Sequence, residues 1–242
     1  MKAATWQQET IEMIVAERKA MDEILEMLAP YEKVLVLGCG GCVSVCLTGG
    51  ERQAEILASQ LSMAAKAKDK DMTADFDCIT RQCDREFFDN LQKDPGDYDA
   101  VLSIACGAGV QYMGEQYPKT PVLPGMNTTF LGSNVANGIW AEYCRGCGDC
   151  VLAWTGGICP VAKCSKGLIN GTCGGTNNGK CEVSEDMDCG WLLIYKRLEE
   201  LGRLDEYRKF RQPRDHRKDR GGGVRRLVLA EMTEDEPQEE DK

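Results

Sequence analysis

Residues 33–46 have the sequence KVLVLGCGGCVSVC, and this stretch decides the expected fold. Lys33–Leu37 is a short apolar run that ends in glycine, which is typical of a buried parallel strand. Further strands are expected at Phe76–Ile79, Tyr98–Ala105 and Pro121–Leu123. Helical spacing of apolar residues predicts helices over residues 7–28, 51–66 and 84–92, and from Gly107 toward Gln116. The alternation predicts an α/β fold with a small, doubly wound, mostly parallel sheet.

Cysteine usage and the absence of a leader indicate a reducing compartment. The chain has 242 residues, with 14 Cys and a single His. Its first residues contain no apolar signal segment, and no run of 18 apolar residues predicts a membrane span. We therefore expect a cytoplasmic protein, in which many thiols indicate metal ligands or redox groups rather than disulfides. One His excludes His-rich zinc sites.

Charge is concentrated near the end of an acidic chain, whose net charge is −10. Residues 208–226 carry nine basic and two acidic residues, and residues 231–242 carry seven acidic residues and one Lys. The basic segment, residues 208–226, lacks the interleaved aromatic residues of a nucleic-acid surface, so we expect a solvated or partner-docking tail. Gly221–Gly223 indicate a flexible joint before a short strand at Val224–Leu229, and the last ten residues have a disordered composition.

A first group of cysteines follows the strand at Lys33–Leu37. Cys39, Cys42 and Cys46 form a C-x2-C-x3-C run in a glycine-rich loop. Because functional crevices lie at the carboxyl ends of parallel strands, we expect these thiols at that edge of the sheet. Three clustered cysteines and a remote fourth are the usual ligands of a [4Fe–4S] cluster. Cys106, directly after the strand VLSIA, is the preferred fourth ligand; Cys78 and Cys83 are alternatives, and buried apolar thiols are the structural alternative.

A second group has the spacing C-x2-C-x2-C. Cys144, Cys147 and Cys150 match the first three ligands of a bacterial ferredoxin-type site. A Cys-Pro pair follows at Cys159, but later than in ferredoxins, so the fourth ligand stays open between Cys159 and Cys164. Zinc is the main competitor, because it also binds four thiolates.

A third group of thiols lies in sequence without helical or strand periodicity. Its members are Cys164, Cys173, Cys181 and Cys189. The Gly- and Asn-rich sequence around them is expected to need a metal to fold. These four cysteines are candidates for a third cluster or a zinc site.

The expected organisation has four parts. Residues 1–30 form an N-terminal helix, 31–135 the α/β domain with the first cluster, 136–203 a loop-rich, Cys-rich metal-binding region, and 204–242 a partly disordered tail.

The cysteine-rich half resembles a known family. CRGCGDCVLAWTGGICPVAKCSKGLINGTCGGTNNGKCEV, followed by DCGWLLIYKRLEELGRLDEYRKF, closely resembles the small subunit of acetogen-type methylenetetrahydrofolate reductase. The resemblance includes GCGGCVSVC and the downstream CGAGVQ, so it extends over most of residues 31–210. In that family the small subunit is an iron–sulfur protein of the Wood–Ljungdahl pathway.

The resemblance implies an electron-transfer and docking subunit. Two or three [4Fe–4S] clusters would pass electrons to the flavin of a catalytic partner subunit, which reduces methylene-tetrahydrofolate to methyl-tetrahydrofolate. A further oxidoreductase would supply the electrons. No flavin and no catalytic residue are expected on this chain, because thiols fill the only loop that imitates a dinucleotide site. The alternatives are a zinc-binding scaffold of the same complex and a self-contained cluster enzyme with an open iron.

Overall fold

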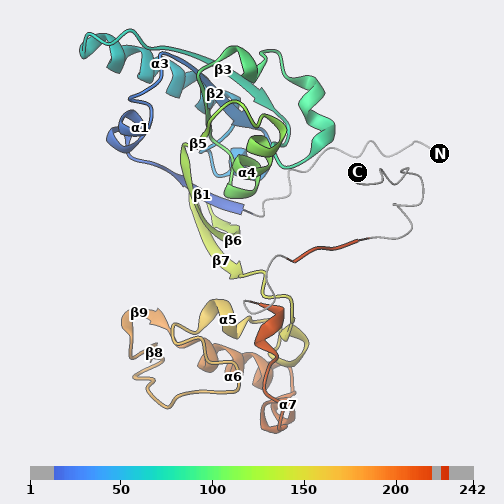
Figure 1. The fold of residues 1–242 in the computed structure, drawn as a ribbon. Helices are drawn as coiled ribbons and strands as arrows, with labels where there is room; N and C mark the ends of the chain where they lie inside the picture. The colour runs from blue at the N-terminus through green and yellow to red at the C-terminus, as the bar shows by residue number, and fades with distance from the viewer. Residues whose placement is uncertain (1–13, 220–224, 229–242) are drawn as a thin grey trace, which may run out of the picture. The chain divides into compact units, whose positions relative to one another are not determined.

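The apolar run at Lys33–Leu37 forms an inner strand of a parallel sheet in the computed structural model, which describes residues 14–219 and 225–228 (Figure 1). The chain divides into two compact units, residues 1–145 and residues 146–242. Each unit is described by itself. The division falls inside the C-x2-C-x2-C run, between Arg145 and Gly146.

Unit 1 contains a four-stranded parallel sheet with the strand order β3-β2-β4-β5. Its strands are β2 (Lys33–Cys39), β3 (Thr73–Ile79), β4 (Ala100–Ser103) and β5 (Val122–Pro124). The helices are α1 (Met21–Met27), α2 (Cys42–Val45), α3 (Glu51–Ala67) and α4 (Gly107–Gln116). The mixed α/β class and the parallel sheet expected from the sequence are confirmed.

Apolar side chains cover both faces of this sheet. Val34 and Val36 share a core cluster with Leu57 and Leu61 of α3. Leu35 and Leu37, which point the other way because strand residues alternate, pack with Met113 of α4. Burial of each leucine contributes about 2 kcal/mol, so the sheet holds its helices without any metal.

The strand register brings three chain segments together at the carboxyl edge. Leu37 pairs with Asp77 on one side and with Ser103 on the other, and Cys39 pairs with Ile79. The order of strands along the chain also reverses here, because β3 lies on one side of β2 and β4 on the other. Ligand sites of parallel sheets lie where the order reverses.

The expected helix over residues 7–28 is wrong for its middle part. Ile14–Arg18 is a strand, β1, and only Met21–Met27 is helical; residues 7–13 lie outside the described residues. β1 pairs antiparallel with β6 (Met126–Ala136), which pairs in turn with β7 (Ile139–Cys144). The apolar residues of β1 fit both periods, and a partner more than 100 residues away decides the conformation.

Two smaller expectations also fail. Residues 85–90 form a 3₁₀ helix, η1 (Arg85–Asn90), whereas we expected an α-helix over Asp84–Gln92. Residues 225–228 have no regular structure, which contradicts the strand expected at Val224–Leu229. The expected joint at Gly221–Gly223 and the expected disordered last ten residues lie outside the described residues.

Unit 2 consists of short elements and long loops. They are η3 (Leu152–Trp154), α5 (Pro160–Lys163), β8 (Lys180–Cys181), β9 (Ser184–Asp188), α6 (Gly190–Glu200), α7 (Leu204–Arg208) and η4 (His216–Lys218). Its apolar core is small: Trp191, Ile194 and Leu198 of α6 are its buried members. The helix expected from Trp191 to Leu201 is confirmed within one residue at each end. In the described ranges, no helix combines the length and the apolar composition that a membrane crossing requires.

Candidate functional site

Gln82 joins the loops that leave β2, β3 and β4. Its side chain is fully buried, and its amide nitrogen donates to the carbonyl oxygens of Leu37 (2.9 Å) and Gly38 (3.0 Å). The Ser103 hydroxyl donates to the amide oxygen of Gln82 at 2.6 Å. One uncharged side chain therefore fixes the ends of three strands, and each of its hydrogen bonds is shielded from water.

Glycine permits a further close approach at the same edge. A Cβ atom on Gly109, in the first turn of α4, would lie 2.8 Å from Cβ of Ala105 and 3.0 Å from Cβ of Gln82. Those distances are shorter than carbon–carbon contact. The start of α4 consequently packs directly against Gln82, and Cys106, the N-cap of α4, is drawn toward the loop that follows β3.

Four thiols lie around this junction. Cys39 and Cys106 are buried, Cys42 is half-buried at the start of α2, and Cys83, the residue after Gln82, is exposed. Burial raises the pKa of the Cys39 thiol, and the nearby thiols of Cys106 and Cys42 add to the shift. Burial also raises the pKa of Cys83, with contributions from Cys106, Cys39 and Cys42 in that order. The thiols of Cys39 and Cys83 are thus each within electrostatic range of Cys42 and Cys106.

Cys46 has different partners. Its sulfur lies 3.0 Å from the Thr48 hydroxyl, 3.3 Å from the Val43 carbonyl oxygen and 3.8 Å from the Ala16 carbonyl oxygen of β1. Cys106 and Cys42 thus act electrostatically on Cys39, while the sulfur of Cys46 contacts β1 of the antiparallel sheet.

Cys78, an alternative fourth ligand, points toward the start of α3. A Cβ atom on Gly38 would lie 2.9 Å from its sulfur. Burial raises the pKa of the Cys78 thiol to about 12, and Cys39, Glu51 and Asp77 contribute further. This thiol stays protonated at neutral pH.

The second group of cysteines lies on loops. Cys144 ends β7 and is exposed, Cys147 is half-buried, and Cys150 is exposed. Cys159 is half-buried and forms the N-cap of α5. Because the run crosses the division between the two units, its members are described only within their own units.

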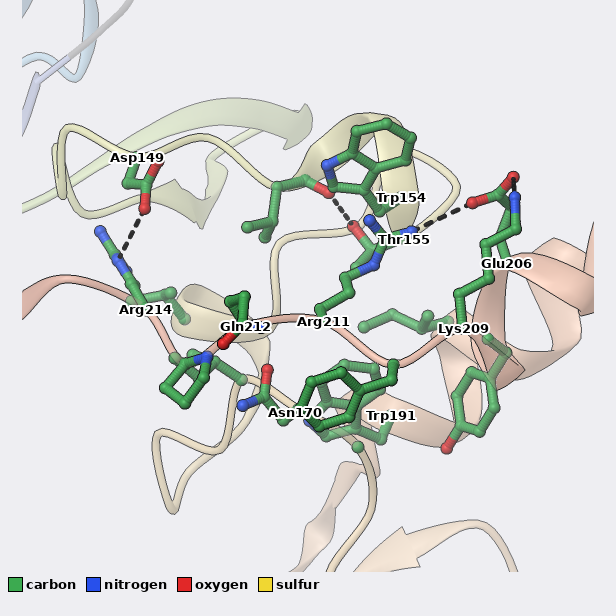
Figure 2. Close-up of a pocket in the computed structure, with 18 of the residues that line it drawn as sticks. Asp149, Trp154, Thr155, Asn170, Trp191, Glu206, Lys209, Arg211, Gln212 and Arg214 are labelled. Atoms are coloured by element: carbon green, nitrogen blue, oxygen red, sulfur yellow. Dashed lines mark hydrogen bonds and ion pairs between the residues drawn. The ribbon is translucent and has the colours of Figure 1, made fainter.

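The basic segment packs on the loop between Cys147 and Cys150 (Figure 2). Arg214, whose side chain is only 6% exposed, donates to the Cys147 carbonyl oxygen at 2.9 Å and forms an ion pair with Asp149 at 3.8 Å. Lys218 forms an ion pair with Asp149 at 3.4 Å, and Arg225 donates to the Gly146 carbonyl oxygen at 2.7 Å. The expected solvated tail is therefore wrong for Arg214, whose side chain is buried, whereas Lys218 and Arg225 contact the loop that carries Cys147 and are themselves exposed.

The same segment forms one wall of a cavity of about 540 Å³ in unit 2 (Figure 2). Trp191 lines the cavity, and so does Trp154, whose ring lies 4.2 Å from the guanidinium of Arg211. Arg211 is held by an ion pair with Glu206 at 3.0 Å. Sequence reasoning missed this cavity, because its walls come from five separate segments of the chain that share no motif.

The third group of cysteines is spread over unit 2. Cys164 and Cys189 border the small apolar core, whereas Cys173 is exposed beside Glu182. Cys181 lies 3.8 Å from the Ser165 hydroxyl. The backbone N–H of Val183 lowers the pKa of the Cys181 thiol, since it stabilises the thiolate.

Within residues 14–219 and 225–228, no group of three or more His, Cys, Asp or Glu side chains is arranged to hold a metal ion. The chemistry of the thiol donors at the sheet edge nevertheless fits a [4Fe–4S] cluster. In such a cluster each of four irons takes one cysteine, so the sulfurs stand further apart than around one ion.

Comparison with known families identifies a related region. Residues 123–217 match the model of a family described as methylene-tetrahydrofolate reductase C terminal. The match begins in β5, ends in η4, and contains the second and third groups of cysteines but not the first. No curated protein and no solved structure matches the chain. Over the matched residues, the chain is thus similar to a part of methylenetetrahydrofolate reductase.

Proposed function

We propose that this chain is an iron–sulfur electron-transfer subunit of a methylenetetrahydrofolate reductase complex. It would serve a flavin-bearing catalytic partner that reduces methylene-tetrahydrofolate to methyl-tetrahydrofolate, as in the Wood–Ljungdahl pathway. The proposal rests on two observations taken together. Residues 123–217 match the family model, and several cysteine thiols lie at the edge of a parallel sheet. Clusters, when bound, supply single-electron transfer, whereas the reduction of the C=N bond belongs to a flavin.

The chain's own residues would hold and tune these clusters. Cys39, Cys42 and Cys106 lie on elements that the sheet and Gln82 keep in place, so the protein positions these ligands before any metal arrives. Cys144, Cys147, Cys150 and Cys159 would hold the second cluster by their spacing, as proposed from the sequence. Arg214 and Lys218 bring positive charge to the loop of Cys147, and a positive charge raises the reduction potential of a nearby cluster.

Zinc is the competing occupant of the third group. The lowered pKa of Cys181 favours a thiolate, which zinc also binds. A chain that held only zinc would be a scaffold of the complex and would transfer no electrons.

The test is the content of iron, acid-labile sulfide and zinc per chain after anaerobic purification, with and without the flavin-bearing partner. About eight irons with matching sulfide support two [4Fe–4S] clusters. About four more irons, or one zinc, assign Cys164, Cys173, Cys181 and Cys189 to a third site. Zinc without iron would contradict electron transfer and leave the scaffold.

A further inference from the structure

We propose that the fourth ligand of the first cluster is Cys83 and that Cys46 is a structural thiol. The complete ligand set is then Cys39, Cys42, Cys83 and Cys106. The inference rests on the proposed function, because it names the ligands of one of the proposed clusters. It departs from the C-x2-C-x3-C spacing, which suggests Cys46.

The position of Cys83 follows from Gln82. The buried amide of Gln82 holds the backbone of this loop against the end of β2, through Leu37 and Gly38, and against Ser103 at the end of β4. Cys83 is the next residue, and it is exposed on the outer side of this junction. It therefore follows directly on the residue that joins the ends of β2 and β4, and the next cysteines along those two segments are Cys39 and Cys106.

The loop after β2 closes the same space. The amide of Gly40 donates to the Ile79 carbonyl oxygen at 2.9 Å, so this loop runs beside the segment that leads to Cys83. A Cβ atom on Gly41 would lie 3.3 Å from the Thr80 carbonyl oxygen and 3.8 Å from the Cys39 sulfur. The same Cβ atom would lie 3.6 Å from Cγ of Arg81, so glycine lets the loop after β2 pass close to Cys39, Thr80 and Arg81.

The electrostatic contacts agree with this geometry. Cys106, Cys39 and Cys42 each act on the thiol of Cys83, with Cys106 the strongest of the three. The thiol of Cys83 is thus within electrostatic range of two buried thiols and one half-buried thiol, and a cluster held by these four cysteines would have its outer side near solvent.

Cys46 is engaged elsewhere by the antiparallel sheet. Its sulfur contacts the Ala16 carbonyl oxygen of β1 and the Thr48 hydroxyl, and both are hydrogen-bond partners of a protonated thiol. Cys78 is also unsuitable, because its sulfur packs against Gly38 and faces the carboxylate of Glu51, which disfavours a thiolate.

Single substitutions in the full chain separate the two assignments. Cys83→Ser, Cys46→Ser and Cys78→Ser are purified anaerobically, and iron and sulfide are measured per chain. We expect Cys83→Ser to lose about four of about eight irons, and the other two variants to keep the full content. Cys46→Ser retains a hydroxyl for Ala16 and Thr48, so its fold is preserved. Loss of four irons from Cys46→Ser, or full content in Cys83→Ser, would overturn the inference.

A second measurement needs no variant. In the chain as purified, the thiols are alkylated under native conditions and located by mass spectrometry, before and after removal of iron with a chelator. Cys83 is exposed to the reagent, so ligation would be its main protection; we expect no label before iron removal and full label afterwards. A labelled Cys83 in the iron-loaded chain would overturn the ligand assignment and leave the proposed function intact. A chain purified without iron would instead contradict the proposed function itself.

Discussion

The two units hold their cysteines by different means. In unit 1 the thiols of Cys39 and Cys106 are buried at the edge of a sheet whose core contains Leu57, Leu61 and Leu102. In unit 2 Cys150 and Cys173 are exposed on loops, and among its described residues the buried apolar cluster consists of Trp191, Ile194 and Leu198 of α6. If both units bind the proposed metals, the fold of unit 1 prepares its site in advance, whereas unit 2 depends on the metal for its own order.

The largest difference between the two units is expected in their amide hydrogen exchange after metal is removed. After anaerobic chelation, we expect amide hydrogen exchange in the loops of residues 159–189 to accelerate by roughly 1,000-fold or more, since the metal proposed for these loops would contribute directly to their folding. Protection in β2 and β4 should remain, because apolar burial holds them. Equal loss of protection in both units would show that the contrast between them is wrong.

Gln82→Glu tests whether unit 1 prepares its site. The substitution replaces the amide donor by a carboxylate that faces the carbonyl oxygens of Leu37 and Gly38. We expect a loss of about 3 kcal/mol in the free energy of unfolding, together with the loss of the first cluster. Denaturant titration and iron content measure the two effects.

Gln116→Glu, at the exposed end of α4, is the matched control and should change neither quantity. A Gln82→Glu chain with normal stability and full iron content would mean that the loops are held by other contacts.

Arg214→Gln tests the contribution of the basic segment to unit 2. The variant loses the charge beside Asp149 and weakens the hydrogen bond to the Cys147 carbonyl oxygen. We expect the free energy of unfolding to fall by about 2 kcal/mol and the reduction potential of the proposed second cluster to become lower. Unfolding and a redox titration followed by electron paramagnetic resonance measure these changes. Arg208→Gln is the control, because Arg208 is exposed and pairs only with Asp205. Identical reduction potentials in the Arg214→Gln and Arg208→Gln variants would show that Arg214 does not tune the cluster.

The smallest expected difference concerns thiol reactivity in the metal-free chain. The pKa of Cys78 is raised from about 9 to about 12, whereas the pKa of Cys181 is lowered. Because thiolates react but lose nucleophilicity as their pKa falls, Cys181 should react with a disulfide reagent roughly 30-fold faster at pH 7.5. The rate of reaction at Cys78 should keep rising with pH up to about 12, while the rate at Cys181 levels off at a lower pH. Mass spectrometry identifies which cysteine has been modified. Equal rates would contradict the burial of Cys78.

The sequence predicts the parallel sheet well and its surroundings poorly. Lys33–Leu37 and the strand before Cys106 are local apolar runs, so their structure and their shared edge follow from short-range patterns. The pairing of β1 with β6 joins residues more than 100 positions apart, and no window of sequence contains it. The different environment of Cys46 follows from that pairing, since Ala16 of β1 is its contact.

The basic segment shows the same limit. Its charge is plain in the sequence, but only the structure reveals that Arg214 is buried against Asp149. Composition indicates how many charges a segment carries, whereas their partners depend on how the chain folds back.

Gln82 also constrains the order of events during synthesis. Its partners lie on β2 and β4, so the junction forms only after Ser103 has left the ribosome and the sheet has paired. Cys39 and Cys42 emerge some sixty residues before Cys106. Until then Cys39, Cys42 and Cys83 have emerged, but Cys106, the last ligand of the proposed first cluster, is missing. Loading of that proposed cluster would thereby be coupled to the completion of the sheet.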